Sequence, residues 1–326
     1  MLAANVGGDT PLPQDGVIQI TFDRYLNPLT ANRQGVTLVD ELGNIPGGPP
    51  IVEYDPVTRV VTISNPSPGA PWLQVGVIYK VEFPIATDEA GSFGLRAIDD
   101  ATIDPATKPL TFQAAPPTGI SPTPPTIDFC ADVFPIFAAT RASTNEVKGA
   151  CTAVACHASG QSAAQGLVLE TPDGIRATTI GVEAVEATTA ALSTPLPPQA
   201  AFPTGMPLVD PGDPGDSYLL YKLLLPDSNG VPSASGTSVP YTACRPITAP
   251  FYYGPGAGFA SADEQARLAE HVVGRRMPWG DWNAQAHAFG TGGGTPLTLD
   301  EIERIRLWIQ EGAEIDDCST CPATMP

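Results

Sequence analysis

Two cysteines and a histidine lie within seven positions of one another, at Cys151, Cys156 and His157 in "KGACTAVACHASG". The whole chain contains only six cysteines and three histidines, so this segment concentrates scarce residue types. Two thiols followed directly by a histidine can attach a haem covalently, because the thiols add to its vinyl groups and the imidazole reaches the iron. The sequence therefore predicts one covalent haem c, held by Cys151 and Cys156, with His157 as an iron ligand.

Two other interpretations of this segment stay open. Four residues separate Cys151 from Cys156, whereas the common C-x-x-C-H motif is shorter. The same residues could form a disulfide beside a surface histidine, or could bind zinc together with Cys318 and Cys321. No second CxxC or HxxxH pair lies at a matching distance, so haem attachment is the favoured interpretation.

The second axial ligand of the iron decides what such a haem can do. A second ligand makes it an electron carrier, whereas an open face favours gas binding or catalysis. The candidates are Met206, Met277, His271 and His287. Met277 is favoured, because in "RRMPWG" a proline stiffens the adjacent backbone and the nearby tryptophans can cover the ring plane. His287 is the alternative ligand, whereas His271 falls on a predicted helix and is expected to be a surface or hydrogen-bonded side chain.

Four cysteines remain outside the motif: Cys130, Cys244, Cys318 and Cys321. An even number in an exported protein predicts two disulfides, for which three pairings are open. Cys318 and Cys321 either pair with each other or join the tail of residues 317–326 to Cys130 and Cys244, and we favour the second arrangement. A redox-active CxxC usually opens a helix, whereas this one follows a predicted helix, so a thioredoxin-like role is not expected.

Composition limits the other possibilities. A chain of 326 residues is expected to form two domains. The net charge of -19 disfavours binding to nucleic acid and to anionic membranes; it favours solubility, or attraction of a basic partner. No apolar run of about 18 residues occurs, so no transmembrane segment is predicted. The beginning of the sequence has no signal peptide pattern. Haem attachment and disulfides nevertheless indicate an exported protein in the periplasm or on the outer cell surface.

Residues 1–115 are predicted to form an all-β sandwich, because short β-branched runs alternate with turn residues. The segments "PQDGVIQITFDRYLNPLT", "VTLVDELGN" and "VTISNPSPGAPWLQVGVIYKVEF" resemble, in this order, bacterial Ig-like domains. Leu73, Gly76 and Tyr79 match a corner of that family, and the resemblance implies that Tyr79 ties a turn to the sheet. It also implies a spacer or docking role. The strands are expected at 16–22, 35–39, 59–64, 76–83 and 109–114.

A Pro-rich, uncharged stretch at residues 116–126 is predicted to be an extended linker. The second domain is expected over 127–316 and to be mainly α-helical and rich in loops. It begins with "IDFCADVFPIFAATRAS", a short amphipathic helix with Pro135 in its first turn or at a kink. Residues 226–260 are rich in Gly, Pro, Ser and Thr and are expected to form a long structured loop.

Two further helices are predicted near the C-terminus. Ser261 and Glu264 have the capping-box spacing in front of a helix over 262–273. Thr298 and Glu301 have the same spacing at the start of "TLDEIERIRLWIQEGA". In that last helix three isoleucines fall on one face and a glycine supplies the stop, at Ile302, Ile305, Ile309 and Gly312.

The second domain resembles a group of monohaem cytochrome c domains found in large secreted bacterial proteins. After the Cys-His motif, that group has a Gly-Leu segment, a "PGDP" turn before a helix, a Met-Pro loop and a closing helix ending in "W-I-x-x-G-A". The resemblance implies that Met277 is the axial thioether and that Met206 occupies an apolar packing position. The corresponding pieces are Gly166 and Leu167, Pro211 to Leu219, Met277 and Pro278, and Trp308 to Ala313.

The sequence thus predicts an exported monohaem c-type cytochrome that carries single electrons and performs no bond chemistry. Its partners would be redox proteins, such as other cytochromes or a membrane-bound electron-transfer complex, and an oligomer stays open. A haem-containing structural or assembly subunit of a larger cell-envelope or extracellular complex is the alternative. A peroxidase-like enzyme is disfavoured, because no distal acid–base pair is evident.

Overall fold

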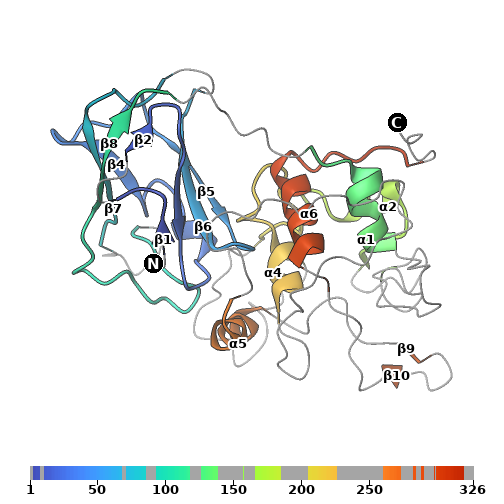
Figure 1. Ribbon diagram of the computed structural model, residues 1–326. Helices are drawn as coiled ribbons and strands as arrows, with labels where there is room; N and C mark the ends of the chain where they lie inside the picture. The colour runs from blue at the N-terminus through green and yellow to red at the C-terminus, as the bar shows by residue number, and fades with distance from the viewer. Residues whose placement is uncertain are drawn as a thin grey trace. The chain divides into compact units, whose positions relative to one another are not determined.

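The protein is described here by a computed structural model (Figure 1). The chain divides into two compact units, an N-terminal unit of Met1–Pro124 with Tyr253–Ala257 and a C-terminal unit of Pro125–Tyr252 with Gly258–Pro326. Residues 282–283, 288–289 and 300 are described by their backbone. The described residues are 3–7, 11–67, 71–85, 93–117, 126–138, 157, 166–184, 205–225, 260–272, 282–283, 288–289, 297 and 299–318.

The N-terminal unit contains two four-stranded sheets, which lie against each other in Figure 1. The first sheet is antiparallel throughout, in the order β1 (Ala3–Ala4), β3 (Ile18–Thr21), β6 (Val60–Ser64) and β5 (Ile51–Asp55). The second sheet is mixed, because β2 runs parallel to β8. Its order is β2 (Leu12–Pro13), β8 (Leu110–Ala115), β7 (Ile78–Glu82) and β4 (Thr37–Asp40).

Alternating burial explains why these segments form strands. Ile18 and Ile20 of β3 are fully buried, and Phe112 and Ala114 of β8 are buried on either side of the exposed Gln113. Side chains two positions apart share one face of a strand, so each sheet contributes its apolar face to one core. All five predicted strands are present, while the sequence missed β1, β2 and β5. The first two are very short, and in β5 only Tyr54 is buried, so its pattern is weak.

The predicted corner around Tyr79 is confirmed. The backbone N–H of Gln74 donates to the Tyr79 hydroxyl at 2.9 Å, which ties the turn before β7 to the sheet. Gly76 has a φ of 84°, a conformation that favours glycine, and its N–H donates to the carbonyl of Ala114. The Tyr79 ring stacks on Phe112 with centroids 5.9 Å apart. The tyrosine therefore joins the turn and the core.

The C-terminal unit contains short helices and a small hairpin. None of the described helices is both long enough and apolar enough to cross a membrane. The hairpin pairs β9 (Trp282–Asn283) with β10 (Ala288–Phe289). The helical elements are the π-helical turn η2 (Phe129–Val133), α1 (Phe134–Ala138), α2 (Pro172–Thr178), α4 (Tyr218–Leu224), α5 (Ala262–His271) and α6 (Leu299–Gln310).

The predicted helices are present with small differences at their ends. Pro135 lies in the first turn of α1, as expected, and a π-helical turn precedes it. The Ser261 hydroxyl accepts a hydrogen bond from the Glu264 N–H at 3.3 Å, which confirms this cap. Helix α5 ends at His271 rather than at residue 273, because Val272 is already extended. Thr298, the predicted cap of α6, lies outside the described residues.

Helix α6 is the central element of the described C-terminal unit. Its three predicted isoleucines at 302, 305 and 309 have no exposed surface. The helix ends at Gln310, and Gly312 shortly after it has a φ of 105°, which supplies the stop that the sequence predicts. Both η2 and α4 pack against α6. The described chain thus combines two β-sheets with several short helices in a mixed fold.

Candidate functional site

His157 is the one residue of the Cys-Cys-His segment that the structure describes. Its side chain is buried, with 6% of its surface exposed. Its carbonyl accepts a hydrogen bond from the Leu169 N–H at 2.8 Å, which fixes the backbone of the motif to the next described segment. The histidine is therefore not the surface residue that the disulfide interpretation assumed, while the pairing of the two cysteines stays a prediction. Cys151 and Cys156 lie outside the described residues.

The segment that holds the backbone of His157 is built around α2. Thr171 caps this helix, since its hydroxyl accepts a hydrogen bond from the Gly174 N–H at 3.0 Å. The N–H of Val168 donates to the Thr178 hydroxyl at 3.0 Å, and this bond joins the residues before the helix to its last residue. Leu169 is buried beside them. The region after the motif is therefore ordered by its own side-chain caps.

Met206 lies inside the C-terminal unit, with 1% of its surface exposed. Its carbonyl accepts a hydrogen bond from the Ala184 N–H at 2.9 Å. Isolated bridges join Ile180 to Val209 and Glu183 to Pro207, so residues 205–209 run beside residues 180–184. This burial agrees with the packing role expected for Met206. The other ligand candidates, Met277 and His287, lie outside the described residues, and His271 is the half-buried last residue of α5.

The turn in front of α4 brings three carboxylates together. The Ser217 hydroxyl donates to the carbonyl of Asp213 at 2.8 Å and accepts from the N–H of Asp210, which closes the turn. Burial raises the pKa of Asp216 to about 6, and the charges of Asp213 and Asp210 add to this effect. Burial also raises the pKa of Asp210. The turn before a helix, implied by the cytochrome resemblance at 211–219, is present.

Aromatic contacts and an ion pair fix η2 and α1 to α6. The ring of Trp308 lies 5.5 Å from that of Phe129 and 6.4 Å from that of Phe137, centroid to centroid. Arg304 of α6 forms a buried ion pair with Asp132. The helical segment that precedes the Cys-Cys-His motif in the chain is therefore held firmly on α6.

The sequence missed the ion pair between Arg304 and Asp132. The sequence pattern that predicts α6 rests on its three isoleucines and indicates no partner for its charged residues. A signal was nevertheless present, because Asp132 stands alone in the apolar run "FCADVFPIF". A carboxylate in such a run is rarely buried without a partner.

A disulfide joins Cys130 to Cys318. Of the pairings left open by the sequence, it agrees with the one that joins the tail to the rest of the unit. Arg176 reinforces this attachment, because its guanidinium donates to the carbonyl of Ile315 at 2.6 Å. The zinc and thioredoxin-like interpretations both need Cys318 as a partner of Cys321, and the disulfide uses it elsewhere. Cys244 and Cys321 lie outside the described residues.

The motif supplies two thiols and a buried imidazole as possible donors to a metal or cofactor. Within the described ranges, no group of three or more His, Cys, Asp or Glu side chains could hold a metal. Two thiols, a buried imidazole and a thioether are the groups that attach and ligate a c-type haem. Comparisons of the chain with protein-family models, with curated proteins and with solved structures found no match.

Proposed function

We propose that this protein is an exported monohaem c-type cytochrome that carries single electrons between redox partner proteins. The observation that supports this most is the buried imidazole of His157 at the end of a Cys-x4-Cys-His segment. An axial ligand must be held away from competing water, and a surface histidine would not meet this requirement. In this proposal residues 127–316 form the cytochrome domain.

Each residue of the proposed site has a separate task. Cys151 and Cys156 would attach the haem through thioether bonds, while His157 and Met277 would be the two protein ligands of its iron. A bound haem supplies one-electron redox chemistry at a potential that its axial ligands set. Two protein ligands leave no open position on the iron, so the chain would carry electrons without catalysing a reaction.

The N-terminal unit would act as an Ig-like spacer or docking domain over residues 1–115, joined by the linker 116–126. The tie between Tyr79 and Gln74 supports the Ig-like assignment, because such sandwiches use a tyrosine at this type of corner. The disulfide between Cys130 and Cys318 supports export to the periplasm or the outer cell surface, since disulfides persist in oxidising compartments.

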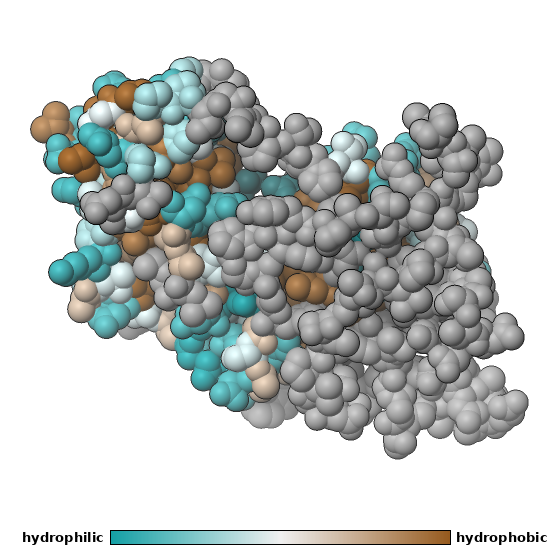
Figure 2. Space-filling model, viewed as in Figure 1, coloured by the Kyte–Doolittle hydropathy of each residue, from teal (hydrophilic) through white to brown (hydrophobic). Residues whose placement is uncertain are grey.

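A structural or assembly subunit of a larger cell-envelope or extracellular complex is the second candidate. Figure 2 shows brown, apolar patches among the polar surface of the N-terminal unit. Contiguous exposed apolar surface commonly marks protein contacts. The large exposed hydrophobic residues described in this unit are Val17, Leu29, Leu42, Ile45, Ile51, Val75, Ile85 and Phe93.

Covalent haem attachment is the first test. The chain should be exported in a host that attaches haem c, then denatured and stained for haem. We expect the wild-type chain to stain, and the double variant Cys151→Ala, Cys156→Ala to lose the stain. Cys244→Ala removes a cysteine outside the motif and should keep it. An unstained wild-type chain would contradict the proposal.

The axial ligand is tested by spectroscopy of the oxidised protein. A thioether-to-iron charge-transfer band should be lost in Met277→Ala and kept in Met206→Ala. Loss of the band in Met206→Ala alone would reverse the assignment. If the wild type lacks this band and His287→Ala creates it, His287 would be the second ligand in the wild type, whose iron would then have two imidazole ligands. A high-spin spectrum that shifts on adding cyanide would favour the peroxidase-like alternative over electron transfer.

The assembly role is separated from electron transfer by the haem-free double variant. If the haem carries electrons, this variant should lose electron transfer to the partner complex. If the protein acts mainly as a structural subunit, the variant should still assemble at the wild-type level and preserve the complex. Loss of assembly together with the haem would count against a purely structural role.

A further inference from the structure

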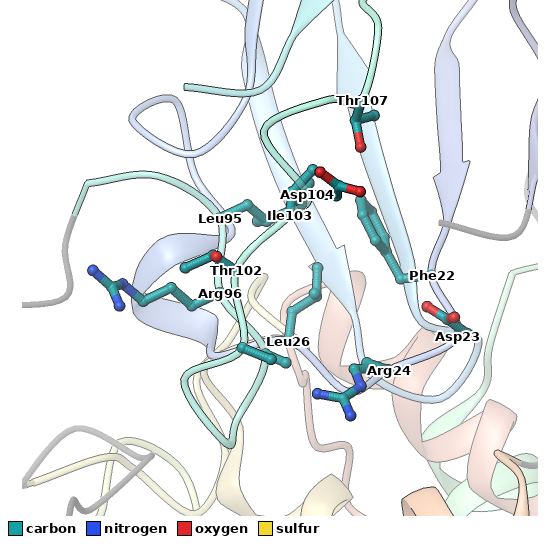
Figure 3. Close-up of a pocket in the computed structure, with 12 residues that line it drawn as sticks. Phe22, Asp23, Arg24, Leu26, Leu95, Arg96, Thr102, Ile103, Asp104 and Thr107 are labelled. Atoms are coloured by element: carbon teal, nitrogen blue, oxygen red, sulfur yellow. The ribbon is translucent and has the colours of Figure 1, made fainter. Parts of the chain in front are cut away.

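A cavity of about 410 Å³ opens in the N-terminal unit, and none of its lining residues is assigned to the haem (Figure 3). Pockets of a few hundred Å³ are large enough for a small ligand or for one side chain of a partner. Three loop segments form this one, at residues 22–26, 95–97 and 101–107. All three lie outside the regular strands.

Backbone bridges and an ion pair hold the three segments in place. Leu26 pairs with Ala97, and Arg96 pairs with Thr102. Both guanidinium contacts between Arg24 and the two carboxylate oxygens of Asp99 measure 2.8 Å. The pocket is therefore formed before any ligand arrives, which lowers the entropic cost of binding.

The floor of the pocket is apolar and the rim is polar. Phe22, Leu26 and Leu95 are buried side chains that contribute to the floor. On the rim, the N–H of Thr107 donates to the carbonyl of Asp104 at 2.8 Å, so the two residues share one turn. Figure 3 shows the Asp104 carboxylate and the Thr107 hydroxyl close together beside the Phe22 ring. An acceptor pair thus stands next to an apolar surface.

Asp104 supplies an uncompensated negative charge to this rim. One of its carboxylate oxygens accepts a hydrogen bond from the Ala106 N–H at 2.8 Å. Within the described part of the chain it forms no ion pair, unlike Arg24, whose charge Asp99 balances. Figure 3 shows the Arg96 side chain extending away from Asp104. A cation that enters the pocket therefore meets a carboxylate and a hydroxyl.

We propose that this pocket binds the side chain of an exposed lysine on a partner protein. The aliphatic stem would lie over Phe22, Leu26 and Leu95, and the ammonium group would donate to Asp104 and to the Thr107 hydroxyl. Lysine combines an apolar stem with a compact charge that has several donors, which matches this arrangement. The net charge of -19 favours the approach of such a basic partner. The inference does not depend on the haem.

The test measures binding of a lysine probe to the full chain. The probe is Nα-acetyl-lysine N-methylamide, and Nα-acetyl-norleucine N-methylamide supplies the same stem without the charge. Saturation-transfer NMR should show transfer to the lysine methylene protons and weaker transfer to norleucine. Asp104→Asn keeps an oxygen for the Ala106 N–H but removes the charge, and because this carboxylate is exposed it should weaken lysine binding about threefold. Glu41→Gln removes one charge from an exposed residue of the same unit and should leave binding unchanged.

A second variant tests the pocket without changing any charge. Ala101→Leu places a larger side chain in the pocket wall and should also reduce transfer, whereas the haem-free double variant of Cys151 and Cys156 should bind the probe as the wild type does. The inference is overturned if Asp104→Asn binds lysine as tightly as the wild type, or if norleucine binds equally well. Failure of haem attachment leaves this result unaffected, so the two proposals can fail separately.

Discussion

Asp216 illustrates how the fold changes the chemistry of a single side chain. Burial raises its pKa from 3.8 to about 6, with smaller contributions from the charges of Asp213 and Asp210. Between these two pH values the native protein binds a proton that the unfolded chain releases. The free energy of unfolding therefore falls as the pH rises through this window. The loss of stability caused by ionising this buried carboxyl is complete above about pH 6.

Replacing the Asp216 carboxylate should remove this loss of stability at neutral pH. Asp216→Asn keeps the shape of the side chain, and the backbone N–H at 216 still donates to Asp213. After allowance for solvent screening of a half-buried group, we expect the variant to be about 1 kcal/mol more stable than the wild type at neutral pH. The two proteins should be equally stable below about pH 3, where this carboxyl is largely protonated in both the native and the unfolded wild type. Urea denaturation at several pH values measures the difference.

The control for this prediction is Asp317→Asn, which removes the same charge from an exposed residue. Its stability should follow that of the wild type at every pH. A gain in Asp317→Asn equal to that in Asp216→Asn would attribute the effect to net charge and would contradict the local explanation.

At the scale of the element, α6 is unusual because charged residues on it are buried along with its isoleucines. Arg304 pairs with Asp132, and the Arg306 guanidinium binds Glu303 through two bonds of 2.8 and 2.7 Å. The Arg304 pair joins α6 to η2. Removing one partner of a buried ion pair leaves the other charge buried without a partner, and this lowers the free energy of unfolding.

Arg304→Met should therefore destabilise the C-terminal unit by about 3 kcal/mol. Adding Asp132→Asn should recover most of the loss, because the stranded charge disappears and an oxygen still accepts the Asp128 N–H. Chemical denaturation followed by tryptophan fluorescence reports this through Trp308. The matched control is Arg24→Met, whose pair with Asp99 is about one-third exposed and should cost less than about 1 kcal/mol. Equal losses at both sites would contradict a special role for burial.

At the scale of the whole molecule, the cysteines are distributed unevenly. All six lie after residue 129, so none belongs to the two sheets of the N-terminal unit. The disulfide from Cys130 to Cys318 spans 188 positions of the sequence and joins the two ends of the C-terminal unit. A cross-link over such a long loop restricts the unfolded chain strongly.

Reducing this disulfide should consequently lower the stability of the C-terminal unit only. A reductant should lower the stability of the C-terminal unit by about 4 kcal/mol and leave the N-terminal unit unchanged. Hydrogen exchange measured by mass spectrometry separates the two, since α1 and α6 should exchange faster while β3 and β7 keep their rates. The double variant Cys130→Ser, Cys318→Ser should resemble the reduced protein at α6. Equal acceleration in both units would show that the disulfide does not act locally.

Much of the regular structure was predictable, because it depends on local patterns. The alternation in β3 and β8 and the isoleucine spacing in α6 follow from the geometry of strands and helices. The caps at Ser261 and the stop at Gly312 are equally local. Strand β5 was missed because its burial depends on the neighbouring strand rather than on its own alternation.

The sequence by itself determined which residues could do chemistry: the Cys-Cys-His segment, its candidate iron ligands and the four remaining cysteines. Only the tertiary structure decided the burial of His157, the pairing of Cys130 with Cys318 and the ion pair between Arg304 and Asp132. It also raised the pKa of Asp216 and assembled the Asp104 pocket from three separated segments. These properties depend on solvent exclusion and on contacts between residues far apart in the chain, which local sequence patterns do not encode.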